Sequence, residues 1–182
     1  MNFTDSANAQ ALNKFPKTTD ENKLSRLNRD LTVDGGNNSF RKGAWTVILS
    51  NEPVDVQQPG STIAYVAFPV AYYGFDGARL GDGTISVNAF AKQYYPKEKS
   101  SSSPERAIKN FDEMASTLGK TPKDIATACI EKGYAFKYEE TKPMFVPTWD
   151  SVNGRNDFNN TRNQDCNYFS AQPLPETIKT KL

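Results

Sequence analysis

The chain has 182 residues, of which 37% are hydrophobic, and its 22 Lys and Arg residues against 21 Asp and Glu residues leave a net charge of +1. The length predicts one domain with extensions, and the balanced charge excludes a polybasic nucleic-acid arm, so a polyanionic partner has to meet a local patch. Histidine is absent, which excludes Ser-His-Asp and Cys-His nucleophile systems as well as histidine metal sites.

The apolar residues are unevenly distributed along the chain. They concentrate between Ala44 and Trp149, whereas both ends are polar. We therefore expect a polar N-terminal arm over residues 1–39, a core domain over 40–149 and a polar, Asn-rich C-terminal extension over 150–182. For the extension we favour a solvated tail with local apolar contacts at Phe158 and at Tyr168 and Phe169. A strand-poor segment wrapped around the core and a partner-binding arm are the alternatives.

The first half of the core predicts three strands separated by turns. The sequence GAWTVILSNEP alternates around Trp45 and Val47 and ends in turn residues, which predicts the first strand. The glycine-rich segment FDGARLGDGT (75–84) predicts a turn. The segment TISVNAFAKQYYP (84–96) then alternates again and predicts the third strand.

The second strand is predicted from the uncharged stretch AYVAFPVAYYGF (64–75), whose alternate side chains point to two faces. Pro69 cannot donate to a ladder, so it marks an edge, a bulge or a bend. A bulge there leaves open whether Tyr72 or Tyr73 faces outward. The side chains that we assign to the core are Val66, Phe68 and Val70.

Two helices are predicted after the third strand. The residues Ser-Pro-Glu at 103–105 supply an N-cap, a proline in the first turn and an acid near the positive helix end, and Gly119 ends this helix. The residues Thr-Pro at 121–122 repeat the start signal, and the second helix ends at Gly133.

Two further strands, YAFKYEE (134–140) and MFVPTW (144–149), complete the predicted core. Three strands, a helical insertion and two strands are the element order of an OB-fold, a five-stranded Greek-key barrel with its helix between strands 3 and 4. Other α+β and sandwich folds share this order. We expect a mainly β, α+β fold: an OB-like five-stranded barrel with two helices between strands 3 and 4.

Enzyme motifs are absent from the sequence. There is no Walker-type loop, dinucleotide glycine pattern, HExxH or nucleophile elbow. Asp76 and Asp82 lack EF-hand spacing and are typical of surface turns, while the adjacent Glu139 and Glu140 point to opposite faces of a strand, which disfavours paired acid-base catalysis. We expect a protein that is not an enzyme and has no cofactor and no metal site.

Aromatic and basic residues are mixed around the second and third predicted strands. Single-stranded nucleic acid binds by stacking bases on exposed rings beside cations that follow the phosphates, and in an OB-fold the face of strands 2 and 3 is the usual platform. The alternative is that these rings pack beneath the polar arm or tail. The candidate stacking residues are Tyr65, Tyr73, Phe75, Tyr94 and Tyr95, and the candidate phosphate contacts are Arg41, Lys42, Arg79, Lys92 and Lys97.

Residues 40–145 resemble phage-encoded single-stranded DNA-binding proteins of the OB type. The resemblance consists of a Gly-rich segment before GAWTVIL, a long strand ending at YYGF, and a third strand. The helical segments ERAIKNFDEMASTLGK and PKDIATACIEKGYAFKYEE complete it. It implies largely sequence-independent binding of single-stranded DNA in phage DNA replication, recombination or repair. Many such proteins also carry an acidic C-terminal tail that recruits partners. This chain departs from that pattern, since it ends in KTKL.

The alternative function is a phage virion or assembly protein with a β-barrel or sandwich core and interacting arms, which the near-zero charge and the Asn-rich ends favour. We expect single-stranded DNA as the partner, and we expect the protein to bind neither a membrane nor a small-molecule substrate. Self-association is left open.

The cellular compartment can be inferred from the two cysteines and from the N-terminal sequence. Cys129 and Cys166 cannot form a structural zinc site by themselves, and Cys129 lies in an apolar helical pattern that predicts a buried side chain. The N-terminal sequence MNFTDSANAQ lacks the basic and apolar segments of a secretory signal, and no apolar run approaches the about 20 residues of a membrane span. We therefore expect a cytoplasmic protein in a reducing environment.

Overall fold

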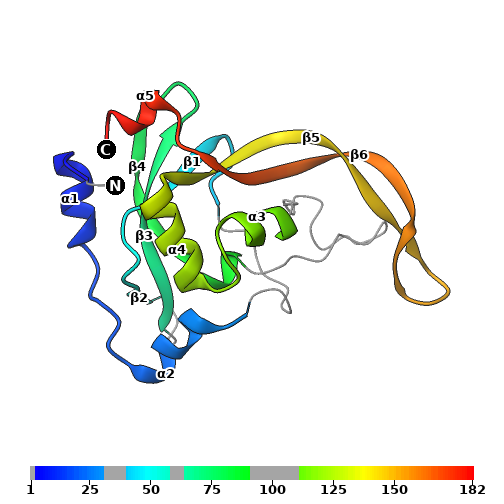
Figure 1. Ribbon diagram of the computed structural model, residues 1–182, viewed down its shortest axis with the longest axis horizontal. Helices are drawn as coiled ribbons and strands as arrows, with labels where there is room; N and C mark the ends of the chain where they lie inside the picture. The colour runs from blue at the N-terminus through cyan, green and yellow to red at the C-terminus, as the bar shows by residue number, and fades with distance from the viewer. Residues whose placement is uncertain (1–2, 31–39, 58–63, 91–110) are drawn as a thin grey trace.

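The structure is a computed structural model that describes residues 3–30, 40–57, 64–90 and 111–182. It is an α+β fold in which one antiparallel sheet has helices packed on both faces (Figure 1). The strands are β1 (Ala44–Ile48), β2 (Val54–Gln57), β3 (Ala64–Gly74), β4 (Arg79–Ser86), β5 (Tyr134–Asp150) and β6 (Arg155–Pro173). The helices are α1 (Ser6–Leu12), α2 (Glu21–Leu24), α3 (Phe111–Thr117), α4 (Pro122–Lys132) and α5 (Glu176–Lys179), with 3-10 turns η1 (Ser25–Asn28) and η3 (Val87–Phe90).

The sheet is built around β3, which has neighbours on both edges. Ala71 pairs with Val47 of β1 and with Asp82 of β4, so these two strands lie on opposite edges of β3. The order continues from β1 to β5 and β6, and β2 extends the β1 edge. Within the described residues no ladder joins β4 to β6, so the sheet is open. The expected mainly antiparallel α+β fold is confirmed, whereas a closed barrel is not.

One face of the sheet carries the larger core, and it is the face to which the side chains assigned to the core from the second predicted strand point. Val66, Phe68 and Val70 are buried there. The helices α3 and α4 and the turn η1 cover this face with Met114, Ile125 and Leu27 among others. The second predicted helix is confirmed, because Thr121 accepts a hydrogen bond from the Asp124 backbone N–H at 3.1 Å and Gly133, with φ 74°, ends α4.

The opposite face of the same sheet is also buried, under the two ends of the chain. Ala11 of α1 and Ile178 of α5 pack there against Trp45, Val47 and Tyr73. The Asp5 backbone N–H donates to the Leu182 carbonyl at 2.9 Å, which joins the two ends directly. The polar N-terminal arm therefore contributes to the packed structure.

The C-terminal extension differs most from expectation. Residues 155–173 form β6, which pairs with β5 from Tyr134↔Pro173 to Asp150↔Arg155. A solvated tail is therefore wrong, because its backbone hydrogen bonds are made in the ladder. The apolar contact expected at Tyr168 and Phe169 is confirmed, since both are buried, whereas Phe158 is exposed. The two strands expected after the helices are also one, since β5 runs without interruption through Pro143.

Two strand boundaries near β4 also differ from expectation. β4 begins at Arg79, inside the segment predicted as a turn, and gives way to η3 at Val87. The irregularity in the β3–β4 ladder lies between Tyr72 and Tyr73 and not at Pro69, which pairs with Thr84. The start of the first predicted helix and the end of the third predicted strand lie outside the described residues.

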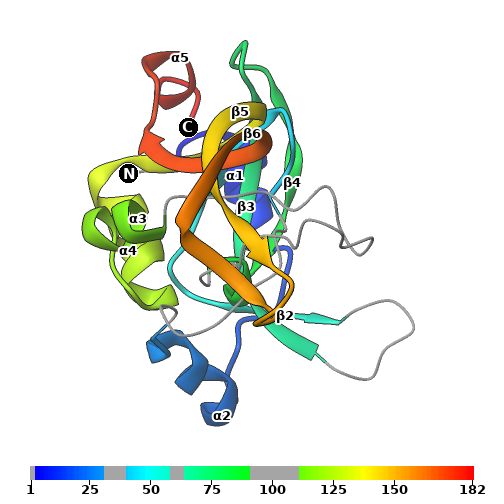
Figure 2. The same cartoon turned by 90° about the vertical axis from the view of Figure 1, so that its right-hand side faces the viewer.

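The distal halves of β5 and β6 form a two-stranded arm, residues 140–165, that stands off from the body (Figure 1). Figure 2 views this arm close to end-on. Phe145, Val152 and Phe158 are exposed on it, at 73%, 91% and 64%. These are large apolar side chains that the body does not cover.

Cys129 and Cys166 are both buried free thiols. Burial of Cys129 raises the pKa of its thiol well above the usual range. Burial and the Asp165 carboxylate raise the pKa of Cys166, while Arg162 acts in the opposite direction. The predicted small buried side chain at Cys129 is confirmed.

No helix in the described ranges has the length and apolar character needed to cross a bilayer.

Candidate nucleic-acid interface

The described residues include only part of the predicted site. Lys92, Tyr94, Tyr95 and Lys97 lie outside them. Tyr65 lies in β3 opposite Val56, and its side chain is likewise outside the described part of the structure. The remaining candidates lie near one end of the sheet, where β3 turns into β4 and β1 begins.

Tyr73 is not the exposed stacking surface that we expected. Its side chain is 1% exposed and packs in the core beneath α1 and α5. The Asn8 side chain of α1 donates to the Tyr73 hydroxyl through Nδ2 at 2.9 Å. For Tyr73 the alternative given above applies: the ring packs beneath the polar N-terminal arm, which covers it.

Among the predicted rings whose side chains the structure describes, Phe75 is the exposed one, at 48%. It follows β3 directly, at the start of the turn that joins β3 to β4. The Lys137 ammonium lies 5.1 Å from the Phe75 ring centroid and 5.9 Å from the Trp45 ring centroid. Cations at this distance from an aromatic face are attracted to it. The lysine and the exposed ring therefore form one surface element.

Lys137 was missed by sequence reasoning, although a signal for it was present. The alternation of Tyr134, Phe136 and Tyr138 places Lys137 on the opposite face of β5. The ladders bring β5 beside β1, with Trp45 opposite Lys137. Glu139, with a carboxylate oxygen 3.8 Å from the Lys137 ammonium, partly offsets this charge.

Arg41 and Lys42 are exposed beside the start of β1. The Arg41 guanidinium lies 5.7 Å from the ring centroid of Tyr72. Burial raises the pKa of Tyr72, and Arg41 acts in the opposite direction. The ring packs closely over Gly83 of β4, where an added Cβ would lie 3.1 Å from the ring. Tyr72 is thus held between Arg41 and β4.

Arg79 begins β4 and points toward the N-terminal segment. Its Nε and Nη2 both donate to Asn8 Oδ1 at 3.2 Å, and Nη2 lies 3.6 Å from the Asp82 carboxylate. Arg79 also lines an open cleft of about 330 Å³ together with Thr4, Asp5, Tyr73, Thr180 and Lys181. Lys181, from the predicted tail, was the second cation missed by sequence reasoning.

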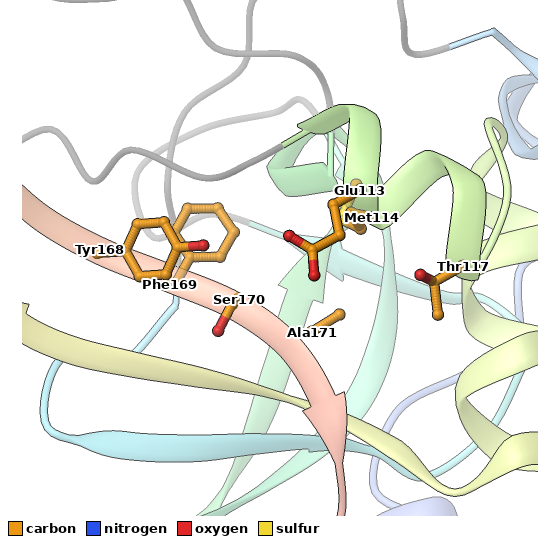
Figure 3. A pocket seen from close by; sticks show the side chains of 7 residues that line it. All are labelled: Glu113, Met114, Thr117, Tyr168, Phe169, Ser170 and Ala171. Carbon is orange, nitrogen blue, oxygen red and sulfur yellow. The ribbon is translucent and has the colours of Figure 1, made fainter. Parts of the chain in front are cut away.

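A smaller cavity lies between α3 and β6 (Figure 3). Glu113 and Met114 face Tyr168 and Phe169 across it. Burial, with the carboxylates of Glu113 and Glu139, raises the pKa of Tyr168. The cavity volume is about 20 Å³, which admits little more than one water molecule. It is therefore a packing defect and not a ligand site.

The described residues contain no cluster of acidic and cysteine side chains that could hold a metal ion. Comparisons of the chain with protein-family models, with characterised proteins and with solved structures found no match. Function is therefore inferred from the geometry of this chain.

Proposed function

We propose that the protein binds single-stranded DNA, largely without sequence preference, at the end of the sheet that carries Phe75. The observation that carries this proposal is the exposed Phe75 ring with the Lys137 ammonium 5.1 Å from its centroid. An exposed ring beside cations is the arrangement that stacks a base and neutralises the adjacent phosphate.

Further basic residues lie at the same end of the sheet as Phe75, because adjacent strands end there together. Ala44, the first residue of β1, pairs with Gly74, the last residue of β3. The Gly43 backbone N–H donates to the Tyr138 carbonyl of β5 at 3.0 Å. These pairings bring Arg41 and Lys42 to the same end of the sheet as Lys137. These three cations therefore lie at this end, although the net charge of the whole chain is only +1.

We further propose that the fold is OB-like. The support is the strand order β5-β1-β3-β4, which is the 4-1-2-3 order of a Greek key. The helices α3 and α4 lie between its third and fourth strands. An OB-fold is a partly open barrel, so the open β4–β6 side is compatible with this assignment.

Replacing Phe75 by Ala is expected to weaken binding of an oligothymidine by about 5- to 150-fold, since stacking one base on a ring contributes about 1–3 kcal/mol. Fluorescence anisotropy of a labelled oligothymidine, at low and at near-physiological salt, measures this effect. Leu80→Ala, which removes another exposed apolar side chain (44% exposed) that has no ring, is the matched control and should retain the affinity.

Duplex DNA serves as the second control and should bind more weakly than the single strand. Absence of single-strand binding at low salt would rule out the proposed function. Equal affinities of the Phe75→Ala variant and the unaltered protein would remove Phe75 from the site and leave the proposal without its supporting observation.

The second candidate function is a structural protein that assembles through its arm. The arm favours it, because Phe145 and Phe158 are exposed there and its acidic and basic side chains are mixed, which suits a protein partner better than a polyanion. Under this function, Phe145→Ser should convert a DNA-free oligomer of defined size into a monomer, as measured by light scattering after size-exclusion chromatography. Val152→Ser is the control, and a monomeric unaltered protein would contradict this function.

A further inference from the structure

The cleft between the two ends of the chain has the polar lining of an anion site. Thr4 and Asp5 come from the N-terminal segment, and Thr180 and Lys181 directly follow α5. Tyr73 of β3 and Arg79 of β4 complete the lining. Two cations thus line a volume of about 330 Å³ together with Asp5 and three hydroxyl-bearing residues, and this volume is at the lower end of the range for ligand sites. The Thr180 hydroxyl already donates to the Glu176 carbonyl at 3.1 Å, so the donors that remain for an anion are those of the other residues.

Arg79 is held in position for such a role by a buried side chain. Asn8 is fully buried, and its Oδ1 accepts hydrogen bonds from both Nε and Nη2 of Arg79 at 3.2 Å. Within the described residues, Nη1 of Arg79 makes no hydrogen bond or ion pair. A guanidinium with one edge fixed and another available suits the fork-like recognition of a phosphate.

Tyr73 gives independent support. The ring is buried, but its hydroxyl oxygen already accepts a hydrogen bond from Asn8 Nδ2 at 2.9 Å. The hydroxyl hydrogen therefore remains to donate, and no acceptor for it occurs among the described residues. Because a buried donor without an acceptor costs free energy, an anion in the cleft would satisfy it.

The acidic residues near the cleft are already engaged. Asp5 caps α1, with its Oδ1 accepting from the backbone N–H groups of Ala7 and Asn8 at 2.9 and 3.2 Å. The Asp82 carboxylate pairs with Lys14 at 3.0 Å as well as with Arg79. Their negative charge is therefore partly offset before a ligand binds.

We propose that the cleft binds a phosphate group and, resting on the proposed function, that this is a backbone phosphate of the strand whose base stacks on Phe75. Lys181 connects the two places, because its Nζ donates to the Gly77 carbonyl at 2.7 Å, in the turn that carries Phe75. Tyr73 is two residues before Phe75 on β3.

The test compares Lys181→Ala and Arg79→Lys with Lys179→Ala, which removes an exposed lysine of α5 that does not line the cleft. Each phosphate contact to a single strand contributes about 0.7 to the slope of log K against log salt. Lys181→Ala is expected to reduce this slope by about 0.7 for oligothymidine, whereas Lys179→Ala leaves it unchanged. Arg79→Lys retains the charge and should lower the affinity without changing the slope.

A second probe separates the cleft from the DNA. Inorganic pyrophosphate is expected to raise the melting temperature of the unaltered protein and of Lys179→Ala, and not that of Lys181→Ala. If oligothymidine binds with the same slope in all variants, the cleft proposal is overturned and the proposed function stands. If only pyrophosphate binds, the anion site stands and its assignment to DNA is overturned, together with the proposed function.

Discussion

Replacing Phe136 by Ala is expected to lower the free energy of unfolding by about 3–5 kcal/mol, the range for truncating a buried phenylalanine. The side chain is fully buried on β5. Its ring centroid lies 4.8 Å from that of Phe40 and 5.4 Å from that of Phe90. Truncation therefore leaves a cavity lined by rings, which cannot collapse without moving several of them. Urea denaturation followed by circular dichroism measures the loss.

The matched control for this variant lies on the same strand. Phe145→Ala removes an equal number of atoms from a ring that is 73% exposed on the arm, so the free energy of unfolding should change by less than about 0.5 kcal/mol. Similar costs for the two variants would show that β5 is not buried where the structure places it.

Sequence alternation predicted one face of β3 well and the other poorly. Val66, Phe68 and Val70 were assigned to the core and are buried. The opposite face carries rings as well, and alternation does not tell whether such rings are exposed or covered. The cover comes from α1 and α5, which are distant in sequence, and only tertiary packing brings Asn8 onto Tyr73.

The predicted tail shows a second limit of local reasoning. Asn and Asp are disfavoured in strands, so RNDFNNTRNQDCNYF predicts solvent-exposed chain. The structure nevertheless pairs this segment with β5, starting from a turn at residues 151–154. Tyr168 and Phe169 were the available signal, because both are buried where β6 joins the main sheet.

The same limits apply to the candidate site. Phe75, Arg41 and Lys42 could be selected from sequence because each lies beside a predicted strand end. For Lys137, alternation along β5 indicates the face on which it lies but not its neighbour. The contacts of Lys137 with Phe75 and of Lys181 with Gly77 join segments that are far apart along the chain. The placing of Lys137 beside Phe75 and of Lys181 beside Gly77 is therefore a property of the fold.

Asn8 is a buried polar link between helix α1 and the sheet, and Asn8→Ala is expected to lower the free energy of unfolding by about 2–3 kcal/mol. Asn8 is fully buried and bonds to both Tyr73 and Arg79. Its loss leaves the Tyr73 hydroxyl and two guanidinium donors without their partner, and a buried polar group without a partner costs about 1–3 kcal/mol. Arg79 can recover part of this cost from water, because its side chain is 24% exposed.

Asn13→Ala is the control, since Asn13 lies at the end of the same helix and its side chain makes an exposed hydrogen bond to the Ala9 carbonyl at 3.2 Å. It should change the free energy of unfolding by less than about 0.5 kcal/mol. Amide hydrogen exchange provides the decisive readout. Asn8→Ala should raise the exchange of α1 amides well beyond that of α4 amides, because α1 loses its buried hydrogen bonds to Tyr73 and Arg79 while the opposite core stays packed. Unchanged protection of α1, with unchanged stability, would mean that the other contacts of the arm, among them the apolar contact of Ala11 and the Lys14–Asp82 ion pair, are sufficient to hold it on the sheet.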